Sequence, residues 1–203
     1  MNNNAILYSQ TGRSMIEMLG VLAIIGVLSI GGIAGYSKAM TKYRINKTAD
    51  QVSQLAQNIR TLYASQKNYS TLSDSVIRKA HLAPEEMYEA TNSNNLTNPF
   101  GGSVYVNYAN KSYDNNKAFY ITAYNIPQEA CVELLTQDWG SGTSSGLIAV
   151  GSGDEVYTAY FAGSRCDYAG YNVNCADKGV MTVDRAISIC SNPTNNHIGW
   201  KFY

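Results

Sequence analysis

An uncharged apolar run near the N-terminus limits the possible folds of this chain more than any other feature. Residues Met18 to Ser37 include no Asp, Glu, Lys or Arg. About 20 apolar residues in a helix match the thickness of a hydrocarbon core. In lipid every backbone group must be hydrogen-bonded within the segment. The run therefore predicts a membrane-embedded helix, and the glycines within it allow neighbouring helices to approach closely.

A signal peptide and a plain membrane anchor are the two simplest interpretations of this run. The first twelve residues carry no Lys or Arg, and the apolar run is too long for a signal peptide. For a plain anchor, the basic residues Lys38, Lys42, Arg44 and Lys47 follow the run and only Arg13 precedes it. By the positive-inside rule this distribution would leave the C-terminal part in the cytoplasm.

The cysteines indicate the opposite orientation. The chain has four, all in its C-terminal half and none in a CxxC pair: Cys131, Cys166, Cys175 and Cys190. An even number beside an N-terminal apolar segment favours two disulfides in an oxidising compartment over four reduced thiols. A zinc site is disfavoured because the close-spaced ligand pairs are missing. We give the cysteines more weight than the lysines and predict an extracytoplasmic C-terminal part.

Glu17 stands at the start of the apolar run, where a carboxylate is expensive unless it is paired. Gly12 lies five residues before it, so cleavage after Gly12 would make Arg13 the first and Glu17 the fifth residue of the mature chain. In this segment the sequence resembles the type IV prepilin family, whose processing motif is a Gly, a cut, a Glu at the fifth mature position and an apolar run. Arg13 departs from the family, which usually has an apolar residue there. It also offers Glu17 a partner four residues away on one helix face.

The resemblance implies how such a chain matures and assembles. A prepilin peptidase would cut after Gly12 on the cytoplasmic side of the inner membrane, and Arg13 would be the N-methylation site. The new α-amino group of one subunit would then approach Glu17 of its neighbour. Removing either partner of such a buried pair is costly, so the pair would set the register of assembly.

The helical pattern continues beyond the membrane run. Apolar residues at three–four spacing from Val52 to Tyr63 predict an amphipathic helix packed on a sheet. We predict one helix from about Ser14 to Gln66, with two helices that bend near Gly31 to Gly35 as the alternative. The expected organisation is a leader (residues 1–12), a membrane and assembly half of the helix (13–37), its amphipathic half (38–67) and a globular head (68–203).

The sequence of the head predicts a strand-rich domain. Strands are predicted at 103–109 and 118–124 around a turn at 114–116, at 146–150 and 156–161 as a second pair, and at 198–203. Short helices are predicted at 74–81, from Pro84, at 128–139 and at 183–189 with Thr182 as cap. The fold class is therefore α+β. The resemblance makes it a pilin fold, a long N-terminal helix packed on an antiparallel sheet with a disulfide-bonded C-terminal region.

The cysteine pairing is not settled by spacing, since four cysteines allow three pairings. A Cys inside a helix bonded to a Cys at the end of a later short helix looks like the type IVb branch of pilins. That likeness implies Cys131–Cys190 and leaves Cys166–Cys175 as a small local loop. The twelve-residue leader is shorter than is typical of that branch, so the subtype stays open.

The composition and the sequence motifs exclude several classes of function. The formal net charge is zero, with 15 basic and 15 acidic residues, so no nucleic-acid partner is expected. No EF-hand, phosphate-binding loop or nucleophile motif is present in the sequence, and we expect no enzyme activity, metal or cofactor.

The resemblance implies a structural subunit of a type IV pilus, for adhesion, aggregation or motility, first in the inner membrane and then on the cell surface. Its expected partners are other copies of itself, the prepilin peptidase and the pilus assembly machinery. A secretion pseudopilin or a membrane-tethered binding protein are the alternatives.

Overall fold

The structure is a computed structural model that describes residues 14–88, 95–109, 116–140, 145–152, 161–162, 165–166, 173–175 and 179–203. The chain divides into two compact units, one up to Thr41 and one from Lys42 to Tyr203. We describe each unit by itself.

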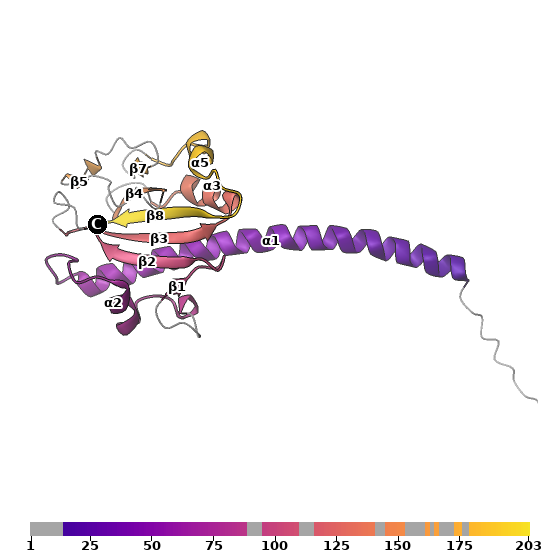
Figure 1. Cartoon of the computed structure of the whole chain (residues 1–203), viewed down its shortest axis with the longest axis horizontal. Coiled ribbons are helices and arrows are strands. Elements are labelled where there is room, and N and C mark those ends of the chain that lie inside the picture. Colours follow the sequence, from indigo (N-terminus) through magenta and orange to yellow (C-terminus); the bar gives the residue numbers. More distant parts are fainter. Residues whose placement is uncertain are drawn as a thin grey trace, which may run out of the picture. The chain divides into compact units, whose positions relative to one another are not determined.

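A single helix, α1 (Met15–Tyr63), runs through the first unit and into the second (Figure 1). This confirms the predicted continuous helix, which ends three residues earlier than expected, and the alternative of two helices is wrong. From Met15 to Ala39 every residue is exposed, whereas from Ile45 onward one side of α1 is buried. The two halves of one helix therefore have different surroundings, as the change in their apolar pattern predicts.

The second unit contains a six-stranded antiparallel sheet with the strand order β1-β2-β3-β8-β4-β7. Its strands are β1 (Leu96–Thr97), β2 (Ser103–Tyr108), β3 (Phe119–Ile126), β4 (Leu147–Ser152), β7 (Val173–Cys175) and β8 (Asn196–Phe202). β5 (Phe161–Ala162) and β6 (Arg165–Cys166) form a separate two-stranded sheet. The C-terminal strand β8 lies between β3 and β4, in the middle of the larger sheet (Figure 1).

One face of this sheet carries the main core. The second half of α1 contributes Val52, Leu55 and Ile59, each at most 1% exposed, to the same apolar cluster as Ile121 and Trp200 of the sheet. Two shorter helices, α3 (Gln128–Thr136) and α5 (Val183–Ile189), add buried residues to that cluster. Each large apolar side chain buried here stabilises the fold by about 1.5–3 kcal/mol. The predicted packing of the amphipathic stripe on a sheet is confirmed.

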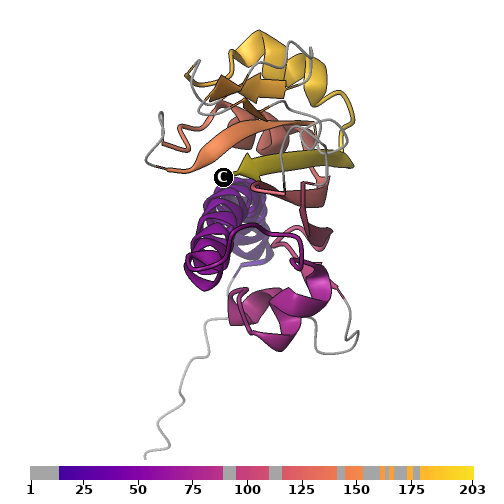
Figure 2. The same ribbon diagram turned by 90° about the vertical axis from the view of Figure 1, so that its left-hand side faces the viewer.

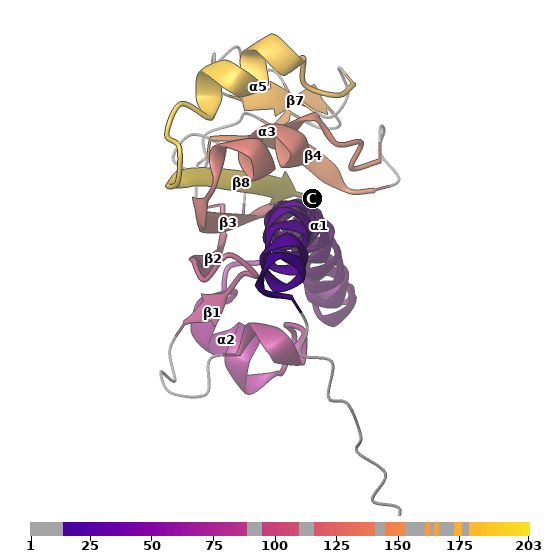
Figure 3. The same ribbon diagram turned by 90° about the vertical axis from the view of Figure 1, so that its right-hand side faces the viewer.

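The β1 edge of the sheet is flanked by α2 (Asp74–Lys79) and the 3₁₀ helix η1 (Glu85–Met87). Figures 2 and 3 show α2 and α5 at opposite ends of the head. Asp74 ties α2 to the sheet, since its Oδ1 accepts a hydrogen bond from the Val106 backbone N–H at 2.8 Å. Burial raises the pKa of the Asp74 carboxyl, and that hydrogen bond opposes the rise.

Two predictions about the head are wrong. β4 was expected to pair with residues 156–161, but both of its edges are occupied, by β7 and by β8. The helix expected to reach Trp139 ends at Thr136, and the Trp139 indole Nε1–H donates to the Leu134 carbonyl at 2.8 Å. Thr182 precedes α5 as predicted but makes no side-chain cap hydrogen bond. The predicted turn at 114–116 lies largely outside the described residues.

Candidate assembly segment and disulfide-linked head

Glu17 lies in the first turn of α1, in a capping box with Ser14. The Ser14 backbone N–H donates to Glu17 Oε2 at 3.2 Å, and the Ser14 hydroxyl oxygen is 3.4 Å from the Ile16 nitrogen. Ser14 also accepts the first intrahelical bond, from the Glu17 N–H at 2.9 Å. A Ser followed by Glu three residues later is the sequence pattern of such a cap. The negative carboxylate is additionally favoured near the positive end of the helix dipole.

The apolar half of α1 presents large side chains on all its sides. From Met15 to Ile33 each large apolar residue is at least 52% exposed. By length and composition α1 is able to cross a membrane. Such a surface is far larger than the apolar patches that monomeric soluble proteins leave exposed. The segment therefore requires a lipid or protein environment that covers it, and the single carboxylate at its edge requires a partner there.

The predicted cleavage site lies outside the described residues. Gly12 and Arg13 both precede Ser14, the first described residue, so processing after Gly12 and methylation of Arg13 stay predictions. The pairing of Glu17 with a neighbouring subunit is likewise a prediction, since only one chain is present.

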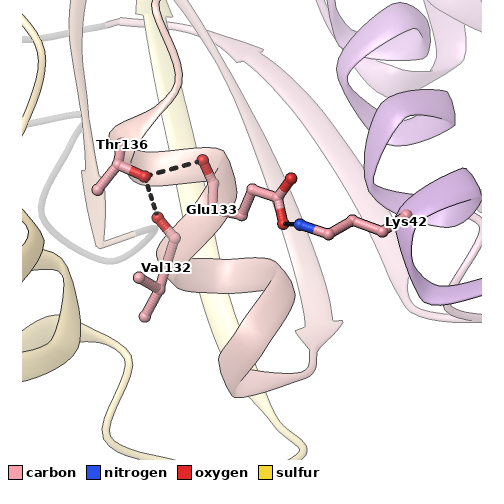
Figure 4. A network of polar contacts seen from close by, with 4 residues as sticks. All are labelled: Lys42, Val132, Glu133 and Thr136. Atoms are coloured by element: carbon pink, nitrogen blue, oxygen red, sulfur yellow. Dashed lines mark hydrogen bonds and ion pairs between the residues drawn. The ribbon is translucent and has the colours of Figure 1, made fainter. Parts of the chain in front are cut away.

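Two ion pairs attach the start of the head's helix to neighbouring elements. The Lys42 ammonium contacts Glu133 of α3, where the Thr136 hydroxyl donates to the Val132 carbonyl at 2.9 Å (Figure 4). The Lys47 ammonium contacts Glu86 of η1. The hydrogen bond between the Lys47 ammonium and the Glu86 carboxylate raises the pKa of Lys47 and lowers the pKa of Glu86. Neither pair is predicted from the sequence, because the partners lie far apart in the chain and only the fold brings them together.

The disulfide Cys131–Cys190 joins α3 to the residue that follows α5, with the two Cα atoms 5.8 Å apart. Both cysteines are fully buried in the main core. This is the pairing that the type IVb likeness implied. Cys175 is also disulfide-bonded, but the side chain of Cys166 lies outside the described part of the chain, so its pairing with Cys175 stays a prediction.

Hydrogen bonds reinforce the same corner of the head. The Asn196 side-chain amide, at the start of β8, donates to the Ile126 carbonyl at 2.9 Å and to the Asn192 carbonyl at 2.6 Å. The Gln128 N–H donates to the Pro193 carbonyl at 3.1 Å, which joins the start of α3 to the same loop. α3, α5 and β8 are thus held together by one covalent and several polar links.

The described residues contain no group of three or more His, Cys, Asp or Glu side chains able to hold a metal ion.

Comparison with known proteins finds one family model and several pilin relatives. The family model described as Bundlin matches residues 37–188. The chain is 29% identical over 185 residues to the "Major structural subunit of bundle-forming pilus" of Escherichia coli O127:H6, which covers 90% of this chain and 89% of that protein. The protein of the same name from Escherichia coli O111:H- is 28% identical over the same length. The toxin coregulated pilin of Vibrio cholerae is 24% identical over 151 residues, 74% of this chain and 66% of that protein.

A solved structure shares the fold. The crystal structure of TcpA, a type IV pilin from Vibrio cholerae El Tor biotype, superposes with a TM-score of 0.50 at 17% identity, over 79% of this chain and 99% of that chain. The family match spans well over half of the sequence, and the fold combines a long N-terminal helix, an antiparallel sheet and a C-terminal disulfide. The chain therefore belongs to the bundlin family and has the fold of a type IV pilin.

Proposed function

We propose that this chain is a structural subunit of a type IV pilus. The observation that carries the proposal is the exposed apolar half of α1, which bears one carboxylate at its first turn and continues into a disulfide-linked head. In a filament the apolar helices of neighbouring copies would cover one another. When a subunit leaves the membrane, these contacts would replace its contacts with lipid, so that the apolar surface would not be exposed to water, at a cost of about 25 cal/mol per Å². The names of the bundlin-family relatives favour a pilus subunit over a secretion pseudopilin.

Maturation would precede assembly. The precursor would lie in the inner membrane with α1 across the bilayer, and a prepilin peptidase would cut after Gly12. The mature chain would then begin with Arg13, the N-methylation site, and the pilus assembly machinery would move subunits into a filament at the cell surface. The filament would serve adhesion, aggregation or motility.

Glu17 would change partners on assembly. Its carboxylate accepts the Ser14 N–H within its own chain. In the filament it would meet the α-amino group of Arg13 from a neighbouring copy, in apolar surroundings where the Arg13 guanidinium would be the other charged group. The attraction between two opposite charges is strong in such a low-dielectric environment, and an unpaired charge there costs several kcal/mol of free energy. Only the register that satisfies every Glu17 would be stable.

Three variants separate this role from helix capping. Glu17→Gln keeps an oxygen that can accept the Ser14 N–H, because Gln also serves in a capping box, but it removes the charge. Ser14→Ala removes the capping hydroxyl and keeps the carboxylate. Glu17→Ala removes both functions of Glu17. We expect Ser14→Ala to form filaments near the normal level and both Glu17 variants to lose most of them.

Filaments sheared from cells are counted by electron microscopy, and the intact mass of the cell-associated chain reports cleavage. A mass that begins at Arg13 in all variants would show that processing is unaffected. Normal filaments from Glu17→Gln would refute the ion-pair role and leave Glu17 as a cap. An uncut N-terminus in the unaltered chain would refute the prepilin interpretation and favour a membrane-tethered protein.

A further inference from the structure

A basic recess lies in the head, where α1 ends. It has a volume of about 630 Å³ and is formed by segments that are far apart in the sequence. The last turn of α1 supplies Arg60, and the chain that follows α1 supplies Lys67 and Tyr69. Lys117, just before β3, and Tyr203, just after β8, complete the set on which the argument rests. A recess of this volume is within the range of small-molecule sites.

The charge of the recess is predominantly positive. Arg60, Lys67 and Lys117 line it, and the described lining residues include no Asp or Glu, so these three cations face one carboxylate, the terminal group of Tyr203 at the end of the printed sequence. Lys67 and Lys117 form no ion pair or hydrogen bond with the described part of the chain. Three cations around one cavity create a positive potential that favours a ligand with two or more negative charges.

Arg60 is held in place by the backbone of a distant loop. Its Nη1 donates to the Ser145 carbonyl at 2.9 Å. A Cβ atom at Gly146 would lie 2.6 Å from Arg60 Cζ, so the guanidinium packs directly on the glycine backbone. One hydrogen bond uses only part of the donor capacity of a guanidinium, which has five N–H groups. Arg60 is thus a fixed donor beside two flexible ammonium groups.

The walls of the recess are ordered by aromatic packing and backbone hydrogen bonds. The Tyr69 ring lies 5.1 Å from that of Tyr63 and 4.9 Å from that of Phe119, between ring centroids. The Tyr69 N–H donates to the Asn116 carbonyl at 2.7 Å, which ties the segment of Lys67 to that of Lys117. The Tyr203 N–H donates to the Gly146 carbonyl at 2.7 Å. The segments that carry the three cations are therefore joined to one another.

Helix capping explains only part of this arrangement. A cation in the last turn of a helix is favoured by the helix dipole, which accounts for Arg60. The same dipole disfavours an anion at this end, by about 0.3–1 kcal/mol where it is exposed. Lys67 and Lys117 lie outside α1, so capping within its last turn does not account for them, and their two charges outweigh the partial charge of the helix end.

We propose that the basic recess binds a small ligand through a phosphate group. A phosphate monoester or a diphosphate carries about two negative charges and several acceptor oxygens, which match one guanidinium and two ammonium groups better than a single carboxylate does. The Tyr69 and Tyr203 rings offer apolar surface to the organic part of such a ligand. This site does not depend on filament assembly, so the inference goes beyond the proposed function.

The test is calorimetric titration of the full chain, in nonionic detergent at about 0.1 M salt, with pyrophosphate as the probe. The variant Lys67→Gln/Lys117→Gln removes two charges from the recess. The control Lys38→Gln/Lys79→Gln removes two exposed lysine charges that do not line it. We expect the recess variant to weaken pyrophosphate binding at least about tenfold and the control to change it less than about twofold, since contact charges dominate over screened distant ones.

Fluorescence of the buried Trp200 checks that both variants are folded, which is expected because all four lysines are exposed. No binding of pyrophosphate by the unaltered chain at millimolar concentration, or an equal loss in the control, would overturn the proposal. A second titration with glycerol 3-phosphate distinguishes the source of the phosphate. Recess-dependent binding of both probes assigns the site to phosphate monoesters, and binding of pyrophosphate alone assigns it to diphosphate groups.

Discussion

Removing the Cys131–Cys190 disulfide tests how the head is stabilised. The two cysteines are 59 residues apart in the sequence. In the chain-entropy model, a cross-link over such a loop lowers the entropy of the unfolded chain by about 14 cal/mol/K, or about 4 kcal/mol at 25 °C. Because the dependence on loop length is logarithmic, a second cross-link inside the loop changes this value little. For comparison, the whole stability of a typical domain is about 5–15 kcal/mol.

Two double variants separate the cross-link from packing. Both sulfur atoms belong to fully buried residues, so Cys131→Ala/Cys190→Ala loses the cross-link and about 1 kcal/mol of packing in addition. Cys131→Val/Cys190→Ala loses the same cross-link and restores volume on the α3 side. We expect losses of about 5 and about 4 kcal/mol, respectively.

Urea unfolding of the full chain in nonionic detergent provides the measurement. The signal comes from Trp139 and Trp200, which lie edge to face with ring centroids 5.1 Å apart beside the disulfide-linked helices. With a denaturant slope of about 2 kcal/mol/M, the unfolding midpoint should fall by about 2 M. A loss below about 1 kcal/mol in the valine variant would refute the reasoning, because it would mean that the hydrogen bonds and packing hold the corner without the covalent link.

Three further changes give predictions in the head. Gly102→Ala would place a Cβ atom 1.8 Å from a backbone carbonyl oxygen of β3, so the free energy of unfolding in urea should fall by about 1–3 kcal/mol or more. Gly101 has a φ of 81° but lies in open space, so Gly101→Ala should lower the free energy of unfolding by only about 1–2 kcal/mol. Burial raises the Asp74 pKa, so the contribution of Asp74 to stability should fall as pH rises from about 4 through that raised value, whereas Glu86, whose pKa is lowered, contributes the opposite dependence. Asp74→Asn should lack this fall and should be the more stable chain at pH 7, as urea midpoints at pH 3.5 and 7 will show. Glu133→Gln should cost less than about 1 kcal/mol at pH 7, since its ion pair with Lys42 is half-exposed.

Local patterns in the sequence predicted the helices and the four longest strands, β2, β3, β4 and β8, but not β1, β6 or β7. The uncharged run and the three–four stripe that follows it depend only on helical periodicity, and they predicted α1 to within three residues at its end. Alternating Tyr and β-branched residues predicted β2 and β3 in the same way. These features are encoded by residues that are neighbours along the chain, so no knowledge of the tertiary structure was needed.

The order of the strands was decided by the tertiary structure. β4 was expected to form a hairpin with the segment that follows it, yet β8 lies against it instead. Strand pairing depends on which apolar faces can be buried together, and residues 147 and 202 are brought together only by the completed core. The end of α3 was likewise mispredicted, because Trp139 turns back to cap a carbonyl of the helix and to pack on Trp200.

The candidate site also combines features that local sequence patterns predict with features that depend on the tertiary structure. The spacing of Gly12 and Glu17 beside an apolar run is local, so the sequence by itself predicts where the assembly segment begins and where its carboxylate lies. The capping box of Ser14 and Glu17 is also local. In contrast, each ion pair of Lys42 and Lys47 joins positions tens of residues apart, and Lys117 comes to the basic recess from a position likewise tens of residues from Arg60 and Lys67. Their proximity depends on how α1, η1, α3 and the sheet pack around one core, and only the tertiary structure decides that packing.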